Sequence, residues 1–129
     1  MRVCSANLGY QMQTSQQTTG QIGEDLAAQL LTAMGYRITA RNQRQGRAEI
    51  DIIAEHGPFL VFVEVKTRTS STFQQPEEAV GEHKRNKLQQ AMNEYLVLNP
   101  WVGPVRYDIV SMVLLADGYK ARIFKDAIS

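Results

Sequence analysis

The chain has 129 residues, of which 43% are hydrophobic and 21% charged, so it is long enough for one soluble domain with a packed core. Its net charge is only +1, so any binding of nucleic acid must depend on a local basic patch. A single cysteine, Cys4, excludes an internal disulfide, and no run approaches the roughly 20 apolar residues of a membrane span. We therefore expect a cytoplasmic protein that does not enter a membrane.

The first 20 residues are rich in Gln, Thr and Ser and show no sustained hydrophobic period. Segments of this composition bury too little apolar surface to offset the entropy of ordering them. We therefore predict a flexible polar leader over residues 1–20 and a single domain over residues 21–129.

The first predicted helix begins near Gln21. Its apolar residues recur at helical spacing at Ile22, Leu26, Leu30 and Met34. Gly35 follows them and can end the helix in a left-handed cap. Glu24 falls at the margin of the buried face and can look toward the sheet, whereas we expect Asp25 to be solvated.

Three strands follow this helix. Alternating apolar and polar residues predict a half-exposed strand over residues 36–42, and a turn follows at 43–47. Two runs rich in Ile, Val and Phe then predict strands over 49–54 and 59–67. Residues 55–58 join them as a four-residue linker, so the pair is expected to form a hairpin.

The remaining elements are a helix and two strands. A polar loop covers residues 69–76, and a second helix lies within 77–99, with Gly81 leaving open whether it begins only after that residue. Strands over 105–115 and 119–125 flank an Asp-Gly step that favours a hairpin turn. The predicted order is α, β, β, β, α, β, β.

Two carboxylates and an ammonium interrupt the apolar strands, at Asp51, Glu64 and Lys66. An ionised group taken out of water without a partner costs several kcal/mol or becomes neutral. Period 2 places Glu64 and Lys66 on one face of their strand. If the linker pairs Ala54 with Phe59, Asp51 lies diagonal to Glu64 on that same face, whereas a slip of one residue would separate them.

This geometry suits a hard divalent cation. Mg²⁺ takes oxygen ligands and commonly uses only one or two protein carboxylates, so Asp51 and Glu64 suffice as its protein ligands. The ion would neutralise the repulsion between them. Lys66 would then point into the site and hold the attacking water and the scissile phosphate.

A metal-binding Asp on one strand, Glu-x-Lys on the next and a Glu on the preceding helix resemble the PD-(D/E)XK nuclease superfamily. The chain resembles more closely the bacterial YraN family, which is similar to archaeal Holliday-junction resolvases. The residues that carry the resemblance are Gly20, Gly23, Glu24, Ala27, Leu30, Gly35, Tyr36, Arg41, Asn42, Glu49 to Asp51, Val61 to Lys66, Arg68, Lys84 and Arg106 to Asp108.

The resemblance implies an α/β fold with a restriction-endonuclease-like αβββαβ core, a mixed central sheet flanked by helices. It implies a Mg²⁺-dependent nuclease, with Mn²⁺ as a substitute, that hydrolyses phosphodiester bonds in structured or branched DNA. Asp51, Glu64 and the Val65 carbonyl would bind the metal, Lys66 would assist catalysis, and Glu24 would support the metal site. Nucleases that cut both strands of a junction are often homodimers, so we expect a homodimer as a candidate assembly.

The chain departs from these families at two positions. Ala48 stands where the YraN family usually has Gly, and Ile50 stands where the superfamily has Pro. Neither change removes a catalytic group.

Basic residues near the site could form a track for phosphates, since Lys and Arg supply most sequence-independent affinity for nucleic acid. The candidates are Arg41, Arg68, Lys84 and Lys87. The alternative for a charged helix face is that it is simply solvated.

Structural readings of the same residues stay open. Asp51 could be an exposed strand carboxylate or the partner of Lys66 in a buried salt bridge. Glu49 could be an extra ligand or could pair with a neighbouring arginine, Arg47 or Arg68. At the level of function, the alternatives to a nuclease are a nucleic-acid-binding module without hydrolysis and a protein-interaction domain with a structural acidic cluster.

Overall fold

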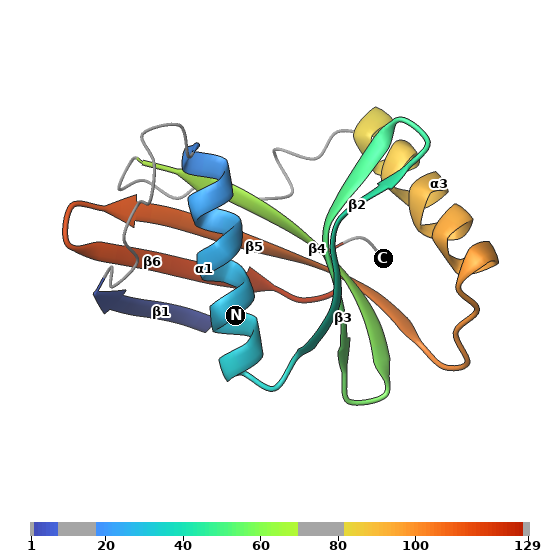
Figure 1. Ribbon diagram of the computed structural model, residues 1–129, viewed down its shortest axis with the longest axis horizontal. Helices are drawn as coiled ribbons and strands as arrows, with labels where there is room; N and C mark the ends of the chain where they lie inside the picture. Colours follow the sequence, from blue (N-terminus) through green and yellow to red (C-terminus); the bar gives the residue numbers. More distant parts are fainter. Residues whose placement is uncertain (1, 8–17, 70–81, 128–129) are drawn as a thin grey trace.

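The computed structural model describes residues 2–7, 18–69 and 82–127. Its elements are β1 (Arg2–Asn7), α1 (Thr19–Ala33), β2 (Arg37–Gln45), β3 (Ala48–His56), β4 (Phe59–Arg68), α3 (Glu82–Leu98), β5 (Val105–Leu115) and β6 (Gly118–Phe124). Within these residues the strands form one six-stranded sheet in the order β1-β6-β5-β4-β3-β2 (Figure 1). Strands β4 and β5 are parallel, and the other neighbours are antiparallel. This confirms the α/β class, the mixed sheet and the αβββαβ core.

Two parts of the predicted leader have regular structure. Strand β1 pairs antiparallel with β6, and Arg2 lies opposite Ile123. Thr18 caps α1, because its hydroxyl accepts a hydrogen bond from the Gln21 N–H at 3.1 Å. Residues 8–17 lie outside the described residues, as do residues 70–81, which contain most of the predicted polar loop and the first part of the predicted second helix. The division into a leader and a domain over 21–129 stays a prediction.

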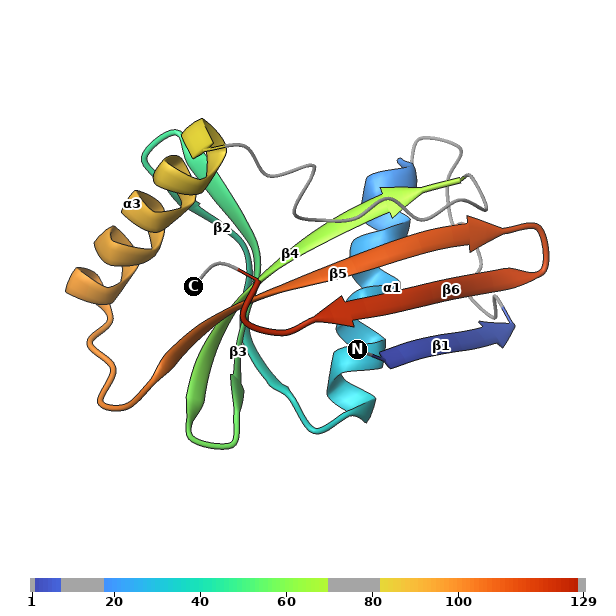
Figure 2. The ribbon, with the colours of Figure 1, turned by 180° about the vertical axis from the view of Figure 1, so that it is seen from behind.

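Helices α1 and α3 cover opposite faces of the sheet. Val61 and Val63 of β4 pack with α1, whereas Leu60 and Phe62 pack with α3. Figure 1 shows α1 in front of the sheet and α3 beside the β2–β3 hairpin, and Figure 2 shows the same arrangement from behind. Strand β4 is therefore buried on both faces, which explains its continuous apolar run. Among the described residues, neither helix has the length and hydropathy of a membrane-crossing segment.

Helix α1 approaches β4 through small side chains. Its fully or nearly buried residues include Gly23, Ala27 and Leu31, while Leu30 and Met34 of the predicted stripe are only partly buried. The stripe is thus rotated from the predicted one. The prediction that Asp25 is solvated is wrong, because this rotation turns Asp25 toward β2, where its carboxylate accepts a hydrogen bond from Arg41 at 2.7 Å.

The contact between Gly23 and Thr67 allows this close approach. A Cβ atom added at Gly23 would overlap the Thr67 side chain, whereas at Gly20 it would meet only the Thr18 hydroxyl at 3.9 Å. Gly23→Ala is expected to lower the free energy of unfolding by about 1–3 kcal/mol, because α1 must move away from β4. In the same helix, Gly20→Ala should leave it unchanged or raise it slightly. Urea denaturation measures both, and equal effects of the two substitutions would contradict this packing.

The β3–β4 hairpin has a shorter turn than predicted. Glu55 and His56 belong to β3, and the turn is Gly57-Pro58, with Gly57 at φ +58° as a two-residue hairpin turn requires. Ala54 therefore pairs with Val61 instead of Phe59. The predicted register is wrong by two residues, and a shift of two keeps every side chain on its face.

The β2–β3 hairpin is also tighter than predicted. Strand β2 extends to Gln45, so the predicted turn over 43–47 is confined to Gly46 and Arg47. Gly46 has φ +61°. The longer strand brings the end of this hairpin against α3.

A buried polar network joins three parts of the chain. Asp108 is fully buried and accepts two hydrogen bonds from Arg106, at 2.9 and 3.0 Å. It also accepts hydrogen bonds from the Tyr36 hydroxyl at 2.9 Å and from the Asp126 N–H at 3.0 Å. Arg106 and Asp108 thus form a buried ion pair. The ring of His56 stacks on that of Tyr36 with centroids 4.0 Å apart.

Candidate functional site

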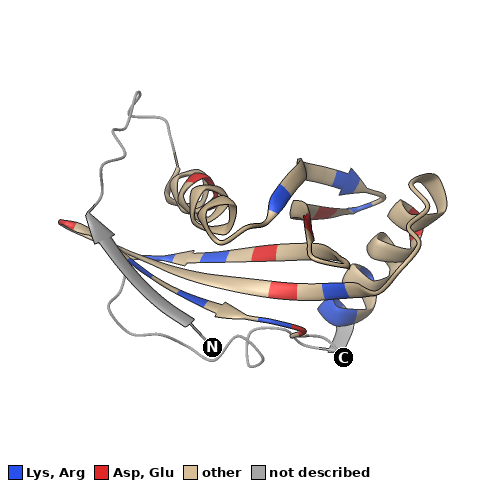
Figure 3. Ribbon diagram, turned by 90° about the horizontal axis from the view of Figure 1, so that it is seen from below, with Lys and Arg blue, Asp and Glu red and all other residues tan. Residues whose placement is uncertain are grey.

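The predicted charged residues meet in a cavity of about 340 Å³ between β3, β4 and the start of α3. Its lining combines three carboxylates with three ammonium groups. The cavity is lined by Ala48, Glu49, Asp51, Glu64, Val65, Lys66, Lys84, Lys87 and Leu88. Figure 3 shows basic and acidic positions next to each other along the strands, so neither sign is segregated to one end of the molecule.

Asp51 and Glu64 lie opposite each other on adjacent strands. The β3–β4 ladder pairs Ile52 with Val63, and the next position places Asp51 against Glu64. The Val65 N–H donates a hydrogen bond to Asp51 Oδ2 at 2.8 Å. Since the N–H and C=O of one strand residue face the same neighbouring strand, the Val65 carbonyl lies on the Asp51 side of β4.

Glu64 is held by three side chains. Lys66 Nζ and Lys84 Nζ both lie 2.9 Å from Glu64 Oε2, and the Tyr107 hydroxyl donates to Oε1 at 3.0 Å. Lys66 therefore pairs with Glu64, whereas one sequence-based alternative paired it with Asp51. The carboxylate is fixed in position while its charge is shared by two ammonium groups.

Burial and the neighbouring charges shift the pKa values of the Asp51 and Glu64 carboxyl groups in opposite directions. Burial, opposed by the Val65 hydrogen bond and reinforced by the charge of Glu64, raises the pKa of Asp51 to about 6. Burial also acts to raise the pKa of Glu64, but hydrogen bonds from Lys66 and Lys84 outweigh it and hold this pKa below the usual value. Burial and the Lys84 ammonium lower the pKa of Lys66. The site thus combines a carboxylate whose ionised form is disfavoured with a lysine that releases its proton more readily than usual.

This difference can be observed directly. In the metal-free protein, we expect the Asp51 carboxyl carbon to titrate with a midpoint near pH 6 and the Glu64 carboxyl carbon below pH 4.5. Carbon-13 NMR of the side-chain carboxyl groups measures both midpoints. Coincident midpoints would contradict the geometry above.

Glu24 lies at the edge of the site and outside the cavity itself. It lines a separate hollow with Arg41 and Asn42, and its carboxylate is 4.0 Å from the Arg41 guanidinium. Burial raises the pKa of Glu24, with Asp51 as the next cause, so the two carboxylates are near enough to repel. Glu24 is therefore close to the site from the α1 side, as its place on the helix margin predicted.

The predicted phosphate-binding residues fall into different environments. Lys87 is exposed and lines the cavity, one turn of α3 beyond Lys84. Arg68 is the last residue of β4, on the same face as Glu64 and Lys66 by period 2. Arg41 is held by Asp25 of α1, so its guanidinium is shared with an acidic partner.

Glu49 also lines the cavity, and its side chain is 43% exposed. Its carboxylate lies 3.8 Å from Arg44, so it pairs with neither of the arginines that we expected. Arg44 lies opposite it in the β2–β3 ladder.

Two contacts of Glu64 could not be derived from the sequence. Tyr107 was noted only as part of the resemblance, and Lys84 was expected to bind phosphate. Tyr107 pairs with Phe62 across the parallel β4–β5 ladder, which puts its side chain on the face that carries Glu64. The strand around Tyr107 is mostly apolar and did not indicate a contact with a charged group, because a tyrosine in such a strand is normally part of the core.

The donor set fits a small divalent cation. It consists of the Asp51 and Glu64 carboxylates and the Val65 carbonyl, all hard oxygen donors. Within residues 2–7, 18–69 and 82–127, no group of three His, Cys, Asp or Glu side chains is arranged to hold a metal. A metal here would therefore use two carboxylates and complete its coordination with the carbonyl, water and substrate oxygens.

Comparison with known proteins finds one family. The model of the uncharacterised protein family UPF0102 matches residues 23–112, which contain every residue of the cavity. A UPF0102 protein of Porphyromonas gingivalis is 43% identical over 104 residues, or 81% of this chain and 77% of that protein. A UPF0102 protein of Symbiobacterium thermophilum is 44% identical over 110 residues, or 84% of this chain and 93% of that protein.

Proposed function

This chain belongs to the uncharacterised protein family UPF0102, and we propose that its charged cavity is the active site of a metal-dependent nuclease of the PD-(D/E)XK type. The observation that carries the proposal is the placement of Asp51 opposite Glu64 with Lys66 on the same face. The proposed substrate is DNA, in structured or branched form, and the proposed cation is Mg²⁺ or Mn²⁺.

Each residue has a role that follows from its contacts. Asp51, Glu64 and the Val65 carbonyl would hold the cation, which supplies Lewis-acid stabilisation of charge on the phosphate. Lys66, with its lowered pKa, would orient water at the phosphate and accept or share its proton. Tyr107 is a positioning residue, because its hydroxyl fixes Glu64 without facing bulk solvent.

Lys84 can serve the substrate as well as Glu64. Its side chain is 41% exposed, whereas that of Lys66 is 23% exposed. If a cation neutralised Glu64, the flexible Lys84 side chain would be able to contact a phosphate oxygen instead. This would place Lys84, Lys87 and Arg68 along one phosphate track.

One observation favours a second function. Two ammonium groups already balance the charge of Glu64, so its burial does not require a metal. It suits a module that binds nucleic acid through Lys84, Lys87 and Arg68 and does not hydrolyse it. A protein-interaction domain is the remaining alternative.

The test is incubation of the purified protein with labelled four-way junction, single-stranded and duplex DNA, each with Mg²⁺, Mn²⁺ or EDTA. We expect metal-dependent cleavage, strongest for branched or single-stranded substrates. Binding without cleavage under every condition would support the second function. Absence of both binding and cleavage would exclude both and leave the protein-interaction domain.

A further inference from the structure

A second cavity, of about 300 Å³, adjoins the proposed active site. It lies between the β2–β3 turn and α3. It is lined by Gln45, Gly46, Arg47, Ala48, Lys87, Gln90, Ala91 and Glu94. Ala48 and Lys87 also line the first cavity, so the two cavities are neighbours.

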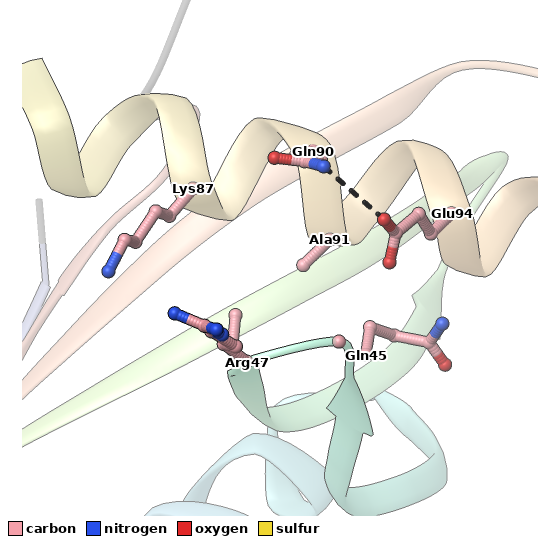
Figure 4. A pocket seen from close by; sticks show the side chains of 8 residues that line it. Gln45, Arg47, Lys87, Gln90, Ala91 and Glu94 are labelled. Atoms are coloured by element: carbon pink, nitrogen blue, oxygen red, sulfur yellow. Dashed lines mark hydrogen bonds between the residues drawn. The ribbon is translucent and has the colours of Figure 1, made fainter.

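The two ends of this second cavity differ in chemistry. Lys87 and Arg47 extend from facing elements at one end, and Gln45 and Glu94 lie at the other end (Figure 4). Because Lys87 also borders the first cavity, the cationic end is the one nearer to the proposed active site. The far end offers amide and carboxylate groups and excludes a phosphate by the charge of Glu94.

The groups at the far end are held in place. Gln45 is 9% exposed, and its Oε1 accepts a hydrogen bond from the Gln43 amide at 3.0 Å. The Glu94 carboxylate lies beside Gly46, where an added Cβ atom would be 3.4 Å from Oε2. Gln90 Nε2 donates a hydrogen bond to Glu94 Oε1 at 3.5 Å, one turn apart on α3.

This arrangement matches the parts of one nucleotide. Lys and Arg bind phosphate, whereas carboxylates and amides recognise base edges, and a glutamate accepts a hydrogen bond from the cytosine amino group. Ala48 and Ala91 provide a small apolar surface for a base between the two ends. Ligand pockets start at roughly 300 Å³, so this cavity admits one base and not a base pair.

We infer that this second cavity is a nucleotide subsite that holds one unstacked base bearing an exocyclic amino group, next to the phosphate in the first cavity. The inference rests on the proposed function and narrows its substrate to DNA with an unpaired base beside the cleaved bond. A base inside a duplex would have to leave the stack to enter.

Binding in EDTA tests this independently of cleavage. Fluorescence anisotropy with labelled oligo(dC), oligo(dT) and blunt duplex DNA would give dissociation constants for the wild type. We expect oligo(dC) to bind more tightly than oligo(dT), by about fivefold, and more tightly than the duplex. Equal affinities for the two oligonucleotides would overturn the inference.

A matched pair of double variants on α3 localises the effect. Gln90→Ala with Glu94→Ala removes a hydrogen-bonded pair of polar side chains that lines the cavity. Gln89→Ala with Asn93→Ala removes an exposed pair that is hydrogen bonded at 3.3 Å and does not line the cavity. The first variant should lose the preference for oligo(dC), and the second should retain it.

The direction in which the affinity changes in the Gln90→Ala, Glu94→Ala variant distinguishes base recognition from a purely electrostatic effect. Loss of the Glu94 charge would strengthen the binding of every oligonucleotide if the cavity acted only through its electrostatic field. Weaker binding of oligo(dC) alone is the result that we expect, and stronger binding of all probes would overturn the subsite.

The subsite and the nuclease can fail separately. If the wild type shows the preference for oligo(dC) but cuts no DNA, the subsite stands and the proposed hydrolysis falls. If it cuts DNA while both double variants bind as the wild type does, the nuclease stands and the subsite falls.

Discussion

Replacing Asp51 with asparagine is expected to lower the rate of metal-dependent DNA hydrolysis by on the order of 10²-fold or more. In the metal-free protein, the same substitution should raise the free energy of unfolding at pH 8. Asparagine keeps the shape of the side chain and an oxygen that can accept the Val65 hydrogen bond. It removes the charge that would bind the cation. The substitution therefore separates the role of Asp51 in function from its cost to folding.

The gain in stability follows from the pKa of Asp51. Its pKa rises from an ordinary 3.8 to about 6 on folding, so the ionised form is disfavoured in the native state. Protonated Asp51 makes its full contribution to the stability of the folded protein below pH 3.8, and this contribution is lost as the pH rises through about 6. The pKa difference corresponds to ~3 kcal/mol for a fully buried group, and partial contact with solvent reduces the expected gain to about 1–2 kcal/mol.

Urea denaturation at pH 8 and pH 4 measures this gain, which should shrink toward zero at the lower pH. Glu49→Gln is the matched control, because Glu49 lines the same cavity but its side chain is 43% exposed. It should change the unfolding free energy by no more than about 0.5 kcal/mol and leave most activity intact. An Asp51→Asn protein that cleaves DNA as fast as the wild type would refute the proposed role of Asp51.

Removal of the Asp108 carboxylate has the largest expected effect on folding. Asp108→Ala should lower the free energy of unfolding by about 3–5 kcal/mol, because it leaves the Arg106 guanidinium buried without its partner. The Arg106 side chain is only 10% exposed. The Tyr36 hydroxyl and the Asp126 N–H lose an acceptor at the same time.

The Arg37–Glu55 pair provides the control for this effect. It has a similar length of 2.8 Å, but the Arg37 side chain is 72% exposed, so Glu55→Ala should cost only about 0–1 kcal/mol. Thermal and urea denaturation compare the two variants, and Asp108→Asn serves if the alanine variant is too unstable to purify. Equal losses for Asp108→Ala and Glu55→Ala would show that the buried network contributes no more than a surface pair.

The core of the candidate site could be predicted because a strand has only two faces. The predicted hairpin register was wrong by two residues, yet Asp51 and Glu64 still share a face, since only an odd shift separates them. The turn itself was harder to place, because Glu55 and His56 are compatible with either a turn or a strand. The positive φ of Gly57 decides for the shorter loop.

Contacts between distant segments were not predictable in the same way. Tyr107 reaches Glu64 only through the parallel pairing of β4 with β5, whose register no local pattern specifies. Strand β1 lies in a segment rich in polar residues without a sustained hydrophobic period, and its pairing depends on the edge of β6 at the other end of the chain. The pairing of Arg41 with Asp25 likewise depends on the rotation of α1 that Gly23 permits.

The most direct test of the metal site is a titration with Mn²⁺, followed by electron paramagnetic resonance of the free ion. The wild type should bind one ion per chain, and Asp51→Asn and Glu64→Gln should each abolish this binding, whereas Glu49→Gln should retain it. No binding by the wild type, or equal binding by all four proteins, would contradict a cation held between Asp51 and Glu64.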